Sequence, residues 1–141
     1  MATFNKYYVF VEALAEKTHN LGSDTLKVAL TNTAPTVATD TVWNTTVAPA
    51  PAAANGYSAG GNTITTTSSA QTTGTYKLVL ADSVFTASGG SIGPFRYVIL
   101  YNSTASNAVI GYYDYGSSIT LADTETFTVD FDASNGVLTL A

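Results

Sequence analysis

The stretch over residues 94–116 constrains the fold most, because its pattern predicts two strands joined by a polar turn. Residues 95–101 are almost entirely apolar and rich in β-branched and aromatic side chains. Residues 109–115 follow after a segment, 102–107, whose Asn, Ser and Thr side chains favour a turn. A run that is apolar on both faces belongs in the middle of a sheet that is covered on both sides. We therefore expect this hairpin to lie at the centre of the fold.

Each strand of the hairpin carries one charged side chain, Arg96 in the first and Asp114 in the second. We predict that these two side chains pair across the hairpin and stabilise it, because opposite charges on facing strands attract. The alternative is that Arg96 binds a substrate. We prefer the pairing.

Other segments alternate apolar and polar residues and are bounded by turn signals. Further strands are predicted at residues 24–31, 62–69, 75–81, 83–87, 117–121, 126–132 and 137–141. In the first of them, Leu26, Val28 and Leu30 share one face and Lys27 points to solvent. Many short strands are typical of a β-sandwich or barrel. We predict an all-β, jelly-roll-like sandwich that occupies residues 1–141 as a single domain.

We predict one helix, over residues 3–20, because apolar side chains recur there with a period of three to four residues. Thr3 is the expected N-cap. Phe10 widens the apolar face beyond what one contact needs. Such a helix either closes the end of the sandwich or also contacts a neighbouring subunit. Tyr8 and Phe10 are therefore candidate interface residues.

Residues 32–61 have little periodic pattern. A segment of this length is a long connection for a compact domain. Pro49 and Pro51 favour extended backbone and resist strand pairing. The segment is either a mobile loop or an arm that becomes ordered on a partner. Trp43, the only tryptophan, is either an interface residue or the anchor of the loop. The candidate interface residues here are Trp43, Pro49, Pro51 and Tyr57.

The composition argues against several classes of function. Charged residues make up 11% of the chain and the net charge is −5, with five basic residues scattered along the sequence. We therefore expect no nucleic-acid partner. No apolar run approaches the ~18 residues of a membrane helix, so we expect no membrane partner, and the first residues lack the pattern of a signal peptide. The chain has no cysteine.

No arrangement of residues predicts a reaction. His19 is the only histidine, and at the end of the predicted helix a cation would suit the helix dipole. Asp130 and Asp132 share a face, but no calcium-loop or glycosidase pattern accompanies them, so a solvated acidic face is the better interpretation. The glycine-rich segment 88–94 lacks the Gly-Lys-Ser/Thr of a phosphate loop. We predict no catalytic residues, no cofactor, no bound metal and no enzymatic activity.

Five stretches carry a resemblance that runs from residue 19 to the last residue. They are HNLGSDTLKVALTNTAP (19–35), NGYSAGGNT (55–63), SGGSIGPFRYVILYN (88–102), IGYYDYGSSITL (110–121) and FTVDFDASNGVLTLA (127–141). Taken together, the chain resembles a family of small virion structural proteins of tailed bacteriophages. The resemblance supplies no catalytic residues.

The resemblance implies a capsid decoration (cement) protein, which binds and stabilises the assembled head. The implied partners are the major capsid protein and further copies of the chain, with a homotrimer favoured. The implied location is the outer surface of the capsid, after synthesis in the host cytoplasm. The alternative is a tail- or fibre-associated module that binds a carbohydrate or receptor. In that case Tyr57, Tyr112, Tyr113 and Tyr115 would form a platform on which sugars stack.

Overall fold

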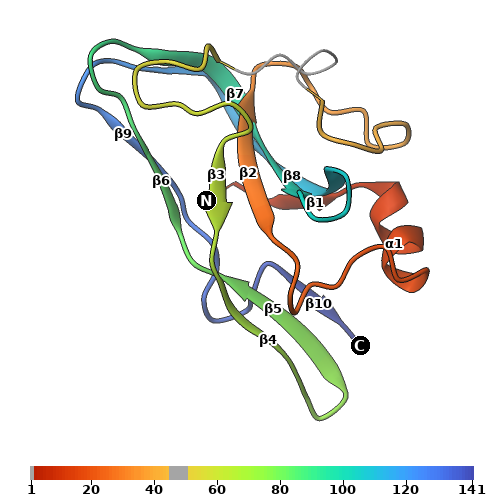
Figure 1. Cartoon of the computed structure of the whole chain (residues 1–141). Coiled ribbons are helices and arrows are strands. Elements are labelled where there is room, and N and C mark those ends of the chain that lie inside the picture. The colour runs from red at the N-terminus through yellow and green to blue at the C-terminus, as the bar shows by residue number, and fades with distance from the viewer. Residues whose placement is uncertain (1, 45–50) are drawn as a thin grey trace.

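The computed structural model describes residues 2–44 and 51–141. These residues form an all-β fold with one short helix, as predicted (Figure 1). The elements are β1 (Phe4–Lys6), α1 (Tyr8–Ala15), β2 (Leu26–Thr31), β3 (Asn62–Ile64), β4 (Thr66–Thr72), β5 (Thr75–Leu80), β6 (Ser83–Thr86), β7 (Ile92–Asn102), β8 (Ala108–Leu121), β9 (Thr126–Val129) and β10 (Leu138–Leu140).

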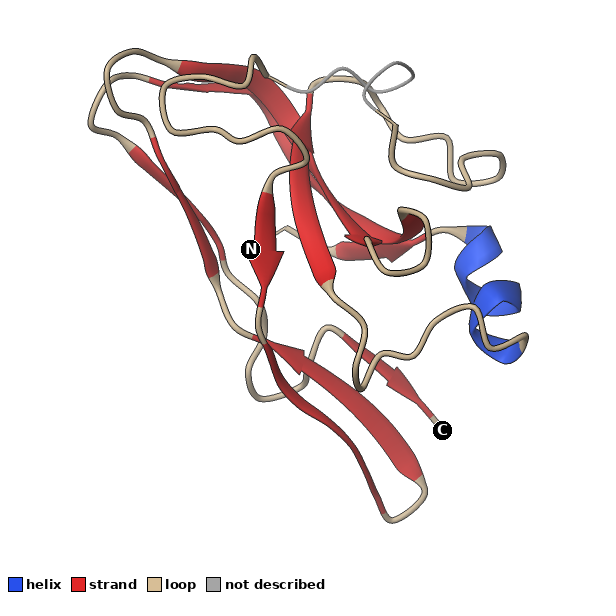
Figure 2. Cartoon of the chain, viewed as in Figure 1, coloured by secondary structure: helices blue, strands red, loops and turns tan. Residues whose placement is uncertain are grey.

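The strands form three sheets, which enclose a common core. The largest has five strands in the order β1-β8-β7-β2-β3, the second has three in the order β10-β5-β4, and the third pairs β6 with β9. Figure 2 shows the β6–β9 pair to the left of the large sheet, the β10-β5-β4 sheet below it, and α1 at the right. The main apolar cluster draws side chains from all three sheets, including Leu30, Leu80 and Phe85. This arrangement is sandwich-like, and the finer jelly-roll assignment stays a prediction.

The predicted central hairpin is present as β7 and β8, the two longest strands. Phe95, Val98 and Leu100 point into the main core. Tyr97 and Tyr101 point to the opposite face, where they join a second apolar cluster. The large sheet is therefore covered on both faces, as expected for strands without a polar side. Residues 117–121, predicted as a separate strand, continue β8.

A β-bulge in β8 keeps the second cluster together. Leu100 pairs with Gly111 and Tyr101 pairs with Val109, so Ile110 is the additional residue. Without it, strict alternation would place Val109 and Tyr112 on opposite faces. With it, both lie in or against the second cluster while Ile110 is buried in the main core.

The start of the chain differs from the prediction of a helix over residues 3–20. Phe4–Lys6 form a strand on the edge of β8, and the helix covers only Tyr8–Ala15. Its N-cap is Tyr7, in extended conformation and without a side-chain cap, rather than Thr3. Strand pairing wins at residues 4–6 because Gly111 leaves room for the ring of Phe4, which also lies 5.5 Å from the ring of Tyr113.

The described parts of residues 32–61 pack onto the protein itself. Trp43 is buried, stacks on Tyr101 at 6.0 Å between ring centroids, and donates its backbone N–H to the carbonyl of Asn107 at 2.8 Å. Tyr57 is also buried, and its hydroxyl accepts the backbone N–H of Leu30 at 3.1 Å. Of the two interpretations of Trp43, the anchor is the one observed. Residues 45–50, including Pro49, lie outside the described residues.

The close approach of Phe4 to Gly111 predicts a large effect of a small substitution. In Gly111→Ala, the new methyl group would occupy space now taken by the Phe4 ring and lie 2.8 Å from the carbonyl oxygen of Asn5. We expect a loss of about 1–3 kcal/mol in the free energy of unfolding, typical of overpacking. Chemical denaturation measures this loss.

Gly22→Ala is the matched control. A methyl group there would meet only Asn20 and Ser69 oxygens at 3.5 Å, which is ordinary contact distance. Equal stability of the two variants would contradict the account of β1.

Candidate functional site

A two-part hollow lies between the helix and the last strand, and we call it the α1–β10 groove. Its smaller part has a volume of about 310 Å³ and its larger part about 590 Å³. Leu14 and Leu140 line both parts, so the two are adjacent. The smaller part is lined by Phe4, Lys6, Phe10, Val11, Leu14, Ala15, Leu138, Thr139 and Leu140. The smaller part is therefore mainly apolar with Lys6 beside it, whereas polar side chains, among them Lys17 and Asp24, line much of the larger part.

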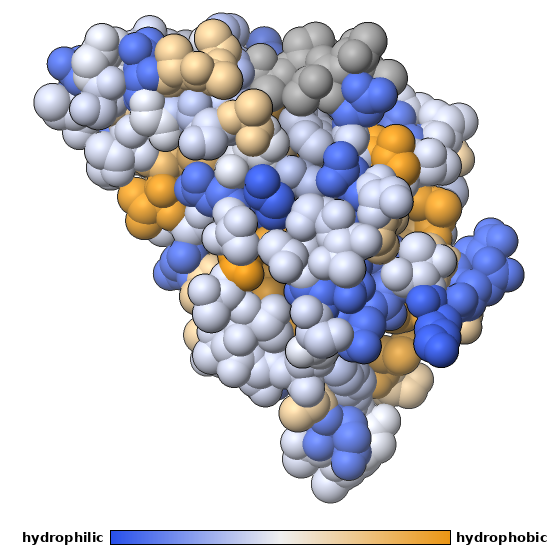
Figure 3. Space-filling view, viewed as in Figure 1, coloured by the Kyte–Doolittle hydropathy of each residue, from blue (hydrophilic) through white to orange (hydrophobic). Residues whose placement is uncertain are grey.

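Large apolar side chains are exposed at and beside this groove. Val11 is 51% exposed, Leu140 is 56% exposed, and Tyr8 is 68% exposed. On α1, Tyr7 and Phe10 point inward and are buried. Val11 and Tyr8 follow next around the helix, so the apolar stripe extends from the buried side onto the exposed surface. Figure 3 shows hydrophobic surface beside α1 and the C-terminal strand.

A partly buried polar network adjoins the larger part, and two of its members, His19 and Asp24, line that part. The side-chain amide of Asn102 donates to Asp24 Oδ2 at 2.6 Å and lies 3.1 Å from Nδ1 of His19. The other side of that amide, Oδ1, accepts the backbone N–H of Ala105, which fixes its orientation. Nδ1 of His19 is therefore an acceptor, and the ring proton is on Nε2. Nε2 is buried without a hydrogen-bond partner among the described residues.

The environment of His19 differs from the one expected from the sequence. The helix ends at Ala15, and the positive φ of Lys17 turns the chain away before His19. The imidazole is buried against Phe10, at 5.2 Å between ring centroids, rather than placed at the helix end. Burial lowers the pKa of His19, and the nearby Asp24 carboxylate opposes this only in part. The ring is thus held neutral in the folded state.

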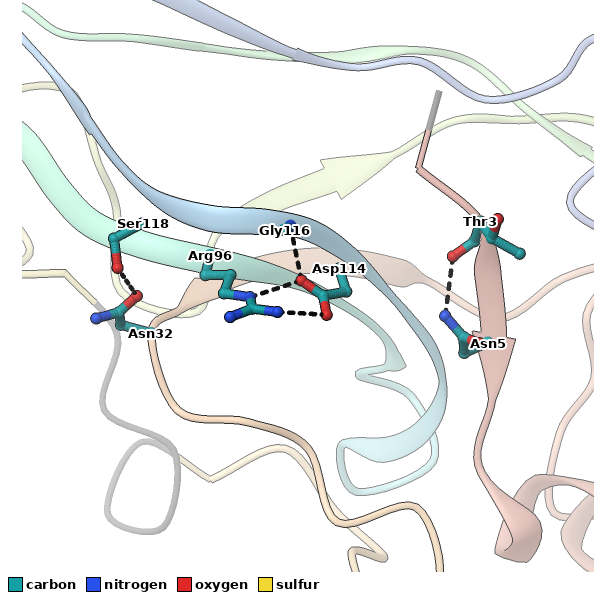
Figure 4. Close-up of polar contacts among 7 residues, drawn as sticks. All are labelled: Thr3, Asn5, Asn32, Arg96, Asp114, Gly116 and Ser118. Carbon is teal, nitrogen blue, oxygen red and sulfur yellow. Dashed lines mark hydrogen bonds and ion pairs between the residues drawn. The ribbon is translucent and has the colours of Figure 1, made fainter.

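The predicted ion pair between Arg96 and Asp114 is present. Arg96 Nε donates to Asp114 Oδ1 at 2.7 Å and Nη2 donates to Oδ2 at 3.0 Å, and the backbone N–H of Gly116 donates to the same carboxylate (Figure 4). The side-chain hydrogen bond from Arg96 holds the pKa of Asp114 below its usual range. Arg96 is therefore engaged within the hairpin, as the preferred interpretation required.

Most of the candidate interface residues predicted from sequence are not exposed. Tyr8 is exposed and Pro51 is half-buried, while Pro49 lies outside the described residues. Phe10, Trp43 and Tyr57 are buried within the chain's own clusters, although Phe10 also lines the smaller part of the groove. Their assignment as contact residues stays a prediction. The sequence analysis did not select Val11 or Leu140 as interface residues, although both are exposed at the groove.

The four tyrosines suggested as a sugar-stacking platform do not share a surface. Tyr57 and Tyr113 are buried in the main core. Tyr112 lies on the opposite face of the large sheet, against the second cluster. Tyr115 packs edge-on against Phe127, at 4.9 Å between ring centroids.

Within residues 2–44 and 51–141, no three His, Asp or Glu side chains come together as a possible metal site. None of the described helices has the length and apolar character needed to cross a membrane. Comparisons with protein-family models, with curated proteins and with solved structures found no match.

The neutral His19 predicts a loss of stability at mildly acidic pH. Its pKa is lowered in the folded state, whereas an unfolded histidine has a pKa of about 6.5. The unfolded state therefore binds more protons, and the free energy of unfolding falls as the pH drops from about 7 to about 5. Because His19 is the only histidine and carboxylates titrate lower, it dominates this range.

Denaturant unfolding measured across this pH range tests the effect. The control is His19→Gln, which has no titrating side chain and should show a flat profile there. A slope that persists in the variant, or a flat profile in the unmodified protein, would contradict the assignment.

Proposed function

We propose that this protein is a structural virion protein that decorates the assembled head of a tailed phage and binds its shell through the α1–β10 groove. The observation that carries the proposal is the exposure of Tyr8, Val11 and Leu140 at and beside that groove. The sequence resemblance, which runs from residue 19 to the end of the chain, adds the class of partner.

Binding of this kind rests on the burial of apolar surface. At about 25 cal/mol per Å², covering three half-exposed side chains contributes on the order of 2–4 kcal/mol per copy, before ordering costs. Among the described residues, Lys6 is the one charged residue that lines the smaller part, so this part favours a partner segment with apolar side chains beside a carboxylate, whereas Lys17 and Asp24 both line the larger part. Many copies on one shell give many such contacts.

The partner in this proposal is the major capsid protein, and the site of action is the outer surface of the capsid, after synthesis in the host cytoplasm. The homotrimer implied by the resemblance stays a prediction. In this role the protein acts by adhesion and catalyses no reaction.

The tail- or fibre-associated binding module is the rival function. The two roles differ in copy number, which gel densitometry of purified virions measures. A decoration protein is present at a level close to that of the major shell protein, whereas a fibre component is far scarcer.

Substitution of Val11 by Glu tests the groove directly. A carboxylate placed there would have to be desolvated on binding, and we expect co-sedimentation with assembled heads to weaken by about tenfold or more. Val84→Glu is the matched control, because Val84 on β6 is also 51% exposed and is not among the groove residues.

The outcomes distinguish an error in the proposed binding surface from an error in the proposed function. If both variants bind as the unmodified protein does, the groove is not the contact surface. If the unmodified protein itself does not bind heads, the proposed function is wrong.

A further inference from the structure

Strand β4 is an unusually long free edge. It pairs with β5 on one side and with no other strand among the described residues. β4 has seven residues, whereas the other edge strands, β1, β3, β10, β6 and β9, have only three or four. Short edges limit unwanted pairing, and long ones are templates for another strand.

The geometry of the hairpin identifies which backbone groups are free. β4 and β5 are joined by Thr73 and Gly74, whose φ values of 48° and 85° fit a type I′ turn. In such a hairpin the pair that flanks the turn, Thr72 with Thr75, is hydrogen-bonded. From there, non-hydrogen-bonded and hydrogen-bonded pairs alternate along the two strands. Ala70 is therefore bonded to β5, while the N–H and C=O groups of Ser69 and Gln71 point away from the hairpin.

The lack of charge on β4 removes the main obstacle to pairing with a second copy of the same chain. A chain with a net charge of −5 repels itself, but β4 carries no charged residue. A register shift between Thr66 and Ser68 interrupts the start of the strand, so 68–72 is its regular part. Ala70 is the centre of this part, and its side chain is exposed.

We propose that β4 pairs antiparallel with β4 of a second copy about a twofold axis at Ala70. Ser69 then faces Gln71 of the second copy, and each pair exchanges two backbone hydrogen bonds. The two three-stranded sheets become one of six strands, in the order β10-β5-β4-β4-β5-β10. Ser69 also lines the larger part of the α1–β10 groove, but the test of this pairing needs only the isolated protein, so its outcome does not depend on head binding.

The surroundings of β4 fit this pairing. Ala70 would face Ala70 of the second copy in a non-hydrogen-bonded pair. Cα atoms in such a pair approach to about 4.5 Å, and a small side chain fits there. The β4–β5 hairpin projects from the body of the molecule, which leaves its edge open to a second copy (Figure 1). A twofold contact of this kind does not by itself produce a trimer.

Two variants of one residue test the backbone pairing. Gln71→Pro removes the outward N–H but no bond to β5, and proline is tolerated at such edge positions. Gln71→Ala keeps the N–H and loses only the side-chain contact to the N–H of Gly74. We expect sedimentation analysis, at up to about 1 mM protein, to show dimers for the unmodified protein and Gln71→Ala. For Gln71→Pro, the dissociation constant of the dimer should be about tenfold or more higher.

A cysteine at the axis tests the register. The chain has no cysteine, so Ala70→Cys introduces a single thiol. Facing Cα atoms at about 4.5 Å lie within disulfide range, and mild oxidation should give a cross-linked dimer rapidly. Ala122 is also exposed and lies in a turn distant in sequence, so Ala122→Cys should not cross-link.

The proposal is overturned if the unmodified protein is monomeric throughout, if Gln71→Pro associates as strongly as Gln71→Ala, or if Ala70→Cys cross-links no faster than Ala122→Cys. A trimer that Gln71→Pro leaves unchanged would also overturn it. Circular dichroism of both Gln71 variants shows whether they are folded.

Discussion

The pairing of β7 with β8 is the interaction on which the rest of the structure depends. β2 is attached to β7 and β1 to β8, so the large sheet is built outward from this hairpin. The hairpin also supplies both apolar clusters, with Leu100 on one face and Tyr101 on the other. A strand with two apolar faces needs cover on both, and this need places the other sheets on one side and the segment around Trp43 on the other.

Much of the sheet structure could be predicted because the signal for a strand is local. The alternation around Leu26, Val28 and Leu30 and the apolar run of β7 can be seen within a few residues. The start of the chain could not be predicted in the same way. The spacing of Phe4 fits one face of a helix, and the choice of strand depends on the slot at Gly111, far along the sequence. Local patterns are overridden where a distant strand offers its edge.

The candidate site shows the same limit. Tyr8 was predicted because it lies in a helix with excess apolar residues, and it is exposed. Val11 belongs to the same stripe, but the placement of Leu140 beside the helix is set by tertiary structure alone. The network of His19, Asp24 and Asn102 joins separate segments and has no sequence signal. Burial also removed Phe10, Trp43 and Tyr57 from the surface, because apolar residues suited to an interface are equally suited to a core.

The stacking of Trp43 on Tyr101 gives the molecule a built-in optical reporter. As the only indole in the sequence, Trp43 accounts for almost all fluorescence excited at the red edge of protein absorption. Because the ring is buried against the outer face of the large sheet, we expect its emission to lie to the blue and to shift to the red when water reaches it. Exposure of Trp43, whether the segment around it detaches or the large sheet unfolds, can thus be followed in real time without a dye.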